Sequence, residues 1–539
     1  MKVQTEYRFI MNFKITGTFL FLFVLTTVFA QKKELQSITQ NELKAHLEFI
    51  AGDNMQGRDF GTPIPGLQIT ADYLKAQCLE MGLIPGGNNY SQPVKMISVQ
   101  TVKESTFIAL KNNNGEEVFR SDQIFAFPGS VNNDTIRGNI VFAGYGYQKD
   151  KNGYNDFEEI DVQDKVVMLM TRNSEIAIDT AQNEDYTKME MMKLGRIFLS
   201  GARAVIFIPD PLNTENKWFD MVEEYAEMGT YQLEGQEREE FPANIILANA
   251  EIADAILMES GKTLREIQQE INRSGKPNSF EIKNVTAEIQ LIKKAEKVEG
   301  ENIIAIIEGS DPVLKNECVV LTAHYDHVGI NSKGEINNGA DDNGSGTVTL
   351  LEVAEAFSQM KKKPLRSVVF AWVTAEEKGL IGSEYYTLNP VFPLEKTLLN
   401  INLDMVGRSA EKELTKVENP EKSLAGPNGV YIITGGNSAE LTHISNKICD
   451  DLNLVPNDAL SEELINGSDH FHFHKNGVPV LGVTTGLHED YHTPDDDVNK
   501  IDYLKMKRVA GFSFLIAYEI ANRKKRLQKE PETGIYLKR

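Results

Sequence analysis

The sequence predicts an α/β protein with a mixed, mostly parallel sheet that helices cover on both faces, and with a β-rich region inserted into it. From residue 300 onward, apolar strand-like runs alternate with helical patterns, as in parallel sheets whose crossovers are helices. Between about 100 and 290, strand-like runs and polar loops predominate instead. Because 539 residues are too many for one hydrophobic core, we expect two or three domains.

The first thirty residues predict a secretory signal peptide. Lys14 precedes an apolar run at 19–25, and small residues lead up to a cleavage position after Ala30. The run is short for a membrane span, which needs about 20 apolar residues. We therefore expect a secreted or periplasmic protein without stable membrane insertion after cleavage, with an uncleaved anchor as the alternative. Either Met1 or Met11 could be the true start.

The mature chain is expected to contain one discontinuous domain and one insertion. The discontinuous domain comprises residues 31–110 and 290–530, the insertion comprises 111–289, and the charged end 531–539 is expected to be flexible. Near the start, apolar residues spaced by 4, 3, 4 and 3 predict one face of a helix, namely Leu67, Ala71, Leu74, Cys78 and Met81. The stretch before it, Gln56–Pro63, reads as a turn-rich link.

Strands and helices are predicted from apolar periodicity in each part. The insertion has expected strands at 107–110, 139–143, 165–170, 204–208 and 280–292, with helices at 188–199 and 252–258. The second half has expected strands at 303–307, 318–322, 367–373, 397–403, 430–434 and 478–484, with helices at 347–360, 439–452 and 503–522.

Charge and cysteine content exclude several classes of partner and site. The net charge is −22, from 78 acidic and 56 basic residues, which argues against binding nucleic acid or an anionic membrane. With only three cysteines, neither a disulfide framework nor a thiolate zinc cluster is expected.

Histidines and carboxylates follow several expected strands of the second half. They come from five segments and comprise His324, Asp341, Glu376, Glu377, Asp404 and His492. Asp341 also precedes a helix, whose N-terminal dipole favours an anion. Because ligands in open α/β sheets bind beyond the carboxyl ends of strands, we expect these side chains to meet at one edge.

This set of donors predicts a hydrolytic metal site. Two histidines and three carboxylates without thiolate suit zinc better than manganese or cobalt. Five ligands exceed those of one tetrahedral zinc but fit two zinc ions when one carboxylate bridges them. Glu376 and Glu377 are adjacent, and neighbouring side chains of an extended backbone point in opposite directions. One can therefore bind metal while the other acts as general base.

The motifs around these residues resemble those of the M28 family of zinc aminopeptidases, which are two-zinc exopeptidases. They are Ala323–His327, Gly339–Gly346, Thr374–Ser383, Asn402–Met405 and Tyr491–Pro494. The resemblance covers about residues 32–100 and 295–525, and it implies the zinc exopeptidase fold. The insertion resembles a protease-associated (PA) domain through the segments Gly144–Gly146, Asp161–Val167 and Gly201–Val205.

The resemblance implies how two zinc ions would be held. One ion would be bound by His324 and Asp404, and the other by Glu377 and His492. Asp341 would bridge the two.

The same resemblance implies roles for the neighbouring residues. Glu376 would be the general base, and Asp326 would hydrogen-bond the imidazole of His324 and fix its tautomer. Tyr491 would steady the oxyanion. The Asp341–Asp342 peptide bond would be cis.

The expected function is hydrolysis of the N-terminal peptide bond of peptides or proteins. Acidic residues around the motifs favour a free α-ammonium group over a free carboxylate, with apolar first residues preferred. Three alternatives stay open: a glutaminyl cyclase, a carboxypeptidase and a non-enzymatic receptor-like relative. The sequence leaves open the side-chain preference, the oligomeric state and the role of the insertion.

Three alternating histidines, His470, His472 and His474, are expected on one face of a short extended segment beside the pocket. Their role is left open.

Overall fold

The described residues form two compact units, divided at 94/95 and 298/299 rather than at the expected 110/111 and 289/290. The computed structural model describes residues 31–113, 115–120, 123–126, 134–147, 153–171, 186–212, 226, 229–236, 244–331, 333–413, 423–435 and 438–527. Strands β2 (Ser91–Thr101) and β12 (Lys293–Ile307) run across the two boundaries. The predicted signal peptide and the tail lie outside the described residues.

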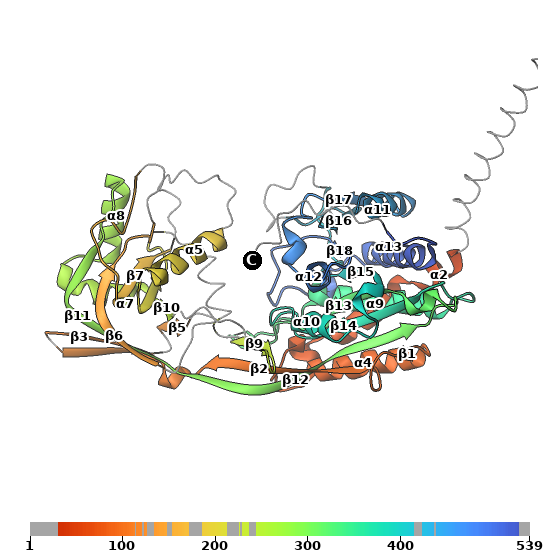
Figure 1. The fold of residues 1–539 in the computed structure, drawn as a ribbon, viewed down its shortest axis with the longest axis horizontal. Coiled ribbons are helices and arrows are strands. Elements are labelled where there is room, and N and C mark those ends of the chain that lie inside the picture. The colour runs from red at the N-terminus through yellow and green to blue at the C-terminus, as the bar shows by residue number, and fades with distance from the viewer. Residues whose placement is uncertain are drawn as a thin grey trace, which may run out of the picture. The chain divides into compact units, whose positions relative to one another are not determined.

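The first unit is built on a mixed sheet (Figure 1). Its central strands pair in parallel in the order β18-β15-β13-β14, with bounds Val480–Thr484, Thr397–Leu403, Cys318–His324 and Ser367–Val373. Antiparallel strands flank them, with β16 (Gly429–Ile433) beside β18 and β12 beside β14. The short strands β17 (Val455–Asn457) and β1 (Ile84–Pro85) pair with β16 and β12.

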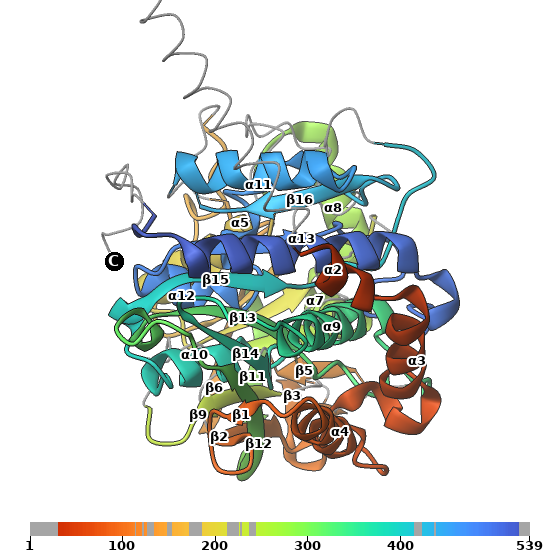
Figure 2. The ribbon, with the colours of Figure 1, turned by 90° about the vertical axis from the view of Figure 1, so that its right-hand side faces the viewer.

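Helices pack on both faces of this sheet because its central strands are apolar on both sides (Figure 2). In β13, Val319 and Leu321 face one core cluster, while Cys318 and Val320 face the other. The first cluster is covered by α3 (Gln40–Ile50), α4 (Gly66–Glu80), α9 (Gly346–Ser358), α11 (Ala439–Asp451) and α13 (Tyr503–Asn522), and α2 (Lys32–Ser37) contacts α9. The second is covered by α10 (Ile381–Leu388) and α12 (His470–Lys475).

The second unit has its own core around a separate mixed sheet. The strand order is β4-β3-β11-β6-β7-β8-β10-β5, with bounds Gly115–Arg120, Phe107–Asn112, Phe280–Leu291, Asp134–Phe142, Val166–Met170, Ala204–Ile208, Ile245–Ala248 and Ile124–Ala126. Helices with described bounds in this unit include α5 (Tyr186–Leu199), α7 (Ala250–Leu257) and α8 (Leu264–Ser274), and β9 (Thr230–Leu233) pairs with β2. Among the described residues of both units, no helix is both long and apolar enough to cross a membrane.

Candidate metal centre

The parallel strands bring the expected residues to one edge of the sheet. His324 is the last residue of β13, the pair Glu376–Glu377 follows β14, and Asp404 follows β15. Because these three strands are neighbours in register, with His324 opposite Val373, their carboxyl ends meet.

The first group of potential ligands contains His324, Asp342 and Asp404. His324 Nε2 lies 3.4 Å from Asp342 Oδ1 and 3.4 Å from Asp404 Oδ1. His324 Nδ1 donates to the main-chain carbonyl of Asp326 at 3.2 Å, which leaves Nε2 to face the two carboxylates.

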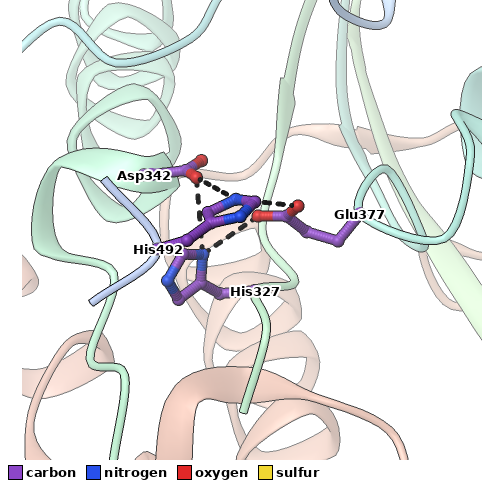
Figure 3. A group of neighbouring side chains, drawn as sticks. All are labelled: His327, Asp342, Glu377 and His492. Atoms are coloured by element: carbon purple, nitrogen blue, oxygen red, sulfur yellow. Dashed lines mark hydrogen bonds and ion pairs between the residues drawn. The ribbon is translucent and has the colours of Figure 1, made fainter. Parts of the chain in front are cut away.

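The second group contains His327, Asp342, Glu377 and His492 (Figure 3). His492 Nε2 lies 3.1 Å from Asp342 Oδ2 and 3.2 Å from Glu377 Oε2. His327 Nδ1 lies 3.0 Å from Glu377 Oε1 and 3.6 Å from Asp342 Oδ2. Asp342 therefore belongs to both groups, and it presents Oδ1 to His324 and Oδ2 to His327 and His492.

The bridging position is occupied by Asp342, one residue after the expected Asp341. Asp341 instead accepts the N–H of Gly407 on Oδ1 at 2.6 Å, and its Oδ2 lies 3.2 Å from His488 Nε2. The prediction of a cis bond at Asp341–Asp342 was likewise wrong, since the cis bond is Asp342–Asn343. Because the two aspartates are adjacent, the sequence does not indicate which of their carboxylates faces the site.

Glu376 and Glu377 lie in the turn after β14, where Ala375 has φ +55°, and not in extended backbone. Burial raises the pKa of Glu376 well above its usual value, and the nearby carboxylates of Glu377 and Asp404 raise it further. Burial also opposes ionisation of Glu377, but His492 and His327 hold its pKa well below the usual value. Opposite shifts in neighbouring carboxylates are typical of an acid–base group beside a charged ligand.

Asp326 positions this turn and does not orient His324 through its side chain as expected. Its carboxylate accepts the main-chain N–H groups of Glu376 at 3.1 Å and Glu377 at 3.2 Å. The distance from His324 Nδ1 to Asp326 Oδ1 is 3.9 Å, too long for a hydrogen bond. The tautomer of His324 is set by the main-chain carbonyl of Asp326.

Two residues near the centre were missed by the sequence reasoning. His327 lies in the Ala323–His327 motif, but nothing in the sequence shows that its ring turns toward Glu377. Asp496 is fully buried and accepts the N–H groups of Asp341 and Asp342, each at 3.0 Å, so it supports the loop that carries the bridging carboxylate. This role of Asp496 was not predicted because the residue lies far from that loop in the sequence.

A cavity opens beside the first group of ligands, and Tyr491 lies at it together with His324 and Glu376. The Tyr491 ring stacks on His492 with centroids 3.8 Å apart. Apolar side chains form much of the remaining wall, namely Met405, Ile433, Leu464, Val483 and Leu487. Polar residues complete the lining, namely Asn402, Ser468, His470 and Thr484.

The alternating histidines lie in the helix α12, so the expectation of an extended segment was wrong. A run of only six residues carries too little periodicity to distinguish helix from strand. His470 Nε2 donates to the Leu464 carbonyl at 3.1 Å, and burial lowers the pKa of His470 to about 4. His470 is therefore a neutral residue of the cavity wall.

The two groups of ligands fit a pair of zinc ions. Ligands about 2.0–2.2 Å from one tetrahedral zinc lie roughly 3.3 Å from one another, similar to the 3.1–3.4 Å that separate His324 and His492 from the neighbouring carboxylates. Asp404 Oδ1 and His492 Nε2 are buried without a hydrogen-bond partner, as expected for atoms that bind a cation. Imidazole and carboxylate without thiolate suit zinc.

Part of the chain is similar in sequence to known peptidases. Residues 302–515 match the model of peptidase family M28. Aminopeptidase YwaD of Bacillus subtilis is 29% identical over 242 residues, which are 43% of this chain and 47% of that protein. Leucine aminopeptidase 2 of Trichophyton equinum is 33% identical over 196 residues, 36% of this chain and 35% of that protein. The chain thus spans about half or less of the length of these relatives.

Solved structures share the fold. An aminopeptidase from Aneurinibacillus sp. strain AM-1 has a TM-score of 0.58 at 19% identity, with 93% of this chain and 98% of that chain covered. BSAP, a zinc aminopeptidase from Bacillus subtilis, has a TM-score of 0.52 at 19% identity, with 91% and 97% covered. The chain therefore has the fold of bacterial aminopeptidases, and residues 302–515 carry the sequence pattern of peptidase family M28.

Proposed function

We propose that this chain is a zinc aminopeptidase of the M28 family that removes the first residue of peptides or proteins. The observation that carries the proposal is that Asp342 belongs to two groups of ligands, with Glu376 beside them. One zinc would be held by His324, Asp342 and Asp404. The other would be held by Asp342, Glu377 and His492. When bound, a zinc pair supplies acidification of a water molecule and polarisation of the scissile carbonyl.

Glu376 is the proposed general base. It takes a proton from the attacking water and delivers that proton to the leaving amine. Its Oε2 lies 3.9 Å from His324 Nε2, beside the first group of ligands. Asp326 holds the Glu376 main chain in place for this transfer.

The proposed substrate presents a free α-ammonium group and an apolar first side chain. Carboxylates of Asp342, Glu376 and Asp404 line the cavity, and no arginine or lysine is among the described residues that line it. Zinc ions would offset the charge of their own ligands, but the described lining offers no side-chain cation for the C-terminal carboxylate that a carboxypeptidase binds. The apolar wall, which includes Ile433 and Leu464, suits an apolar side chain. Tyr491, beside His492, is the proposed hydrogen-bond donor to the oxyanion.

Two further parts of the proposal rest on sequence. The signal-peptide pattern at 1–30 supports export to the periplasm or the medium. The glycine-aromatic and strand motifs of the inserted unit support its identification as a PA domain.

The test compares three substrates with the purified protein supplied with zinc. They are leucyl p-nitroanilide, its N-acetylated form and a peptide with a blocked amine but a free C-terminus. Hydrolysis of the free form alone is expected. Equal hydrolysis of the acetylated form would show that the amine is not read, and activity on the third alone would indicate a carboxypeptidase. A peptide with N-terminal glutamine that loses ammonia and keeps its first residue would indicate a cyclase.

A further inference from the structure

Residues Gly57–Asp59, which read as part of a turn-rich link in the sequence, contact the loops that carry the proposed ligands. Gly57 and Arg58 belong to η1 (Asp53–Arg58), between α3 and α4, more than 200 positions before the ligand loops. The segment lies outside the stretch 302–515 that matches the family model. We call these three residues the 57–59 segment.

Arg58 is fully buried and bonds main-chain carbonyls with its whole guanidinium. The acceptors, with their distances, are Tyr325 (2.9 Å, from Nε), Ile50 (2.9 Å) and Asn338 (2.7 Å, both from Nη1), and Gly339 (2.8 Å) and Asp342 (3.4 Å, both from Nη2). A guanidinium has five N–H donors in a fixed plane, so each of its N–H groups has an acceptor here. Burial lowers the pKa of Arg58 to about 10, which leaves it charged at neutral pH.

Four of the five carbonyls that Arg58 binds belong to two ligand loops; the fifth, that of Ile50, ends α3. Tyr325 directly follows His324, while 338–342 ends at the bridging Asp342. One rigid cation therefore fixes the separation of two loops that must place their side chains around the same ions.

The main chain of the segment adds to this contact. His327 donates its N–H to the Arg58 carbonyl at 3.2 Å, and Gly329 donates to the Gly57 carbonyl at 3.1 Å. Gly57 has φ +71°, and a Cβ there would lie 2.4 Å from the carbonyl oxygen of Asn337. A side chain at this position would push the segment away from the ligand loops.

Asp59 reaches the third ligand loop. Its Oδ1 lies 2.9 Å from Nζ of Lys378, the neighbour of Glu377, and the Lys378 side chain is 2% exposed. The Asp59 side chain is 16% exposed, so the pair is buried mainly on the lysine side, and removal of the Asp59 carboxylate would take a counter-charge from the buried Lys378 ammonium group.

We propose that Arg58 and Asp59 are positioning residues that hold the three ligand loops at the spacing the metal pair requires. This inference rests on the proposed function, since it assumes that the loops bind metal. It adds a part of the chain that lies outside the stretch matched by the family model.

The test is Arg58→Lys, which keeps the charge but loses the planar five-donor geometry. Arg366→Lys is the matched control, because Arg366 is likewise buried, with 1% exposed, and bonds Glu317 at 2.7 Å and a main-chain carbonyl. It lies beside the start of β14, away from the ligand-bearing end of that strand. Zinc affinity is measured by competition with a chelator, and cobalt-loaded protein is compared by visible spectroscopy.

We expect Arg58→Lys to bind zinc about 10–100-fold more weakly, the usual cost of losing a residue that orients metal ligands, and to change the cobalt spectrum. Arg366→Lys is expected to lower the melting temperature but to leave the zinc affinity and the cobalt spectrum unchanged. Wild-type zinc affinity and an unchanged cobalt spectrum in folded Arg58→Lys would overturn the proposal.

Two further measurements keep the inference testable. If Arg58→Lys does not fold, Asp59→Asn removes the charge facing Lys378 while its Oδ1 can still accept from Phe60 N–H, and it is expected to weaken zinc binding. If the wild-type chain binds no zinc, the proposed function fails. Amide hydrogen exchange of the metal-free protein then tests separately whether Arg58 holds the loops in place. Faster exchange at 324–329 and 338–343 in Arg58→Lys, but not in Arg366→Lys, supports it. Equal exchange contradicts it.

Discussion

Adjacent residues Asp341 and Asp342 contact different partners: Asp342 lies against His324 and His492, whereas Asp341 accepts the N–H of Gly407. The two carboxylates therefore have separate tasks. Asp342 joins the two groups of proposed ligands, and Asp341 holds its own loop against the segment that contains Gly407. The zinc contents expected of Asp342→Asn and Asp341→Asn depend on this division.

Glu376→Gln and Glu377→Gln should have different effects. Glu376→Gln removes the proposed base but preserves its shape, so turnover should fall about 10²–10⁴-fold while zinc is retained. Glu377→Gln removes a ligand charge facing His492, so zinc should be lost. Steady-state kinetics and metal analysis on both variants check this. Exchanged phenotypes would reverse the assignment within the pair.

His327→Gln should weaken one zinc selectively. The His327 ring donates to Glu377 Oε1 at 3.0 Å and so leaves Oε2 turned toward His492. Loss of this contact is expected to lower zinc affinity about tenfold or more at the Glu377–His492 position. Calorimetric zinc titration is the measurement, and exposed His443, replaced by glutamine, is the control. Two zinc affinities equal to those of the wild type would refute the role given to His327.

Glu352 should make stability fall as pH rises, independently of the metal centre. Burial raises the pKa of Glu352 to about 8. Nearby Glu42 and Glu355 also raise this pKa, whereas the hydrogen bond from the Thr39 N–H lowers it. Between about pH 4.5 and 8 the unfolded chain releases a proton that the folded chain keeps. Stability therefore declines over that window, by at most about 1.4 kcal/mol per pH unit, and is unaffected by this group below it.

Glu352→Gln should remove that decline, because an amide does not titrate. The check is the melting temperature of metal-free protein from pH 4 to 9. The melting temperature of the variant should increase relative to that of the wild type as pH rises toward 8. A constant difference across the range would show that Glu352 ionises normally.

Local sequence patterns predicted the long, strongly apolar elements well. The helix at 503–522 and the strands at 367–373 and 397–403 have their expected bounds, because each is a continuous apolar or periodic run that the core requires. The six-residue α12 was missed because its few residues hold no decisive period.

The sequence identified the edge where the site lies but not the orientation of its side chains. His324 and Asp404 end neighbouring parallel strands, which local patterns can reveal. Whether the carboxylate of Asp341 or that of Asp342 faces the proposed metal site depends on the backbone conformation of one loop. Arg58 acts through carbonyls hundreds of positions away, and neither periodicity nor motif spacing records such a contact.

The most direct test of the account is the zinc content of the wild type, Asp342→Asn and Asp341→Asn, measured by elemental analysis after dialysis. We predict two zinc ions per chain in the wild type, loss of both from Asp342→Asn, and retention of most zinc in Asp341→Asn, whose side-chain oxygen can still accept from Gly407. One firmly bound zinc in the wild type, or two retained in Asp342→Asn, would contradict a centre bridged by Asp342.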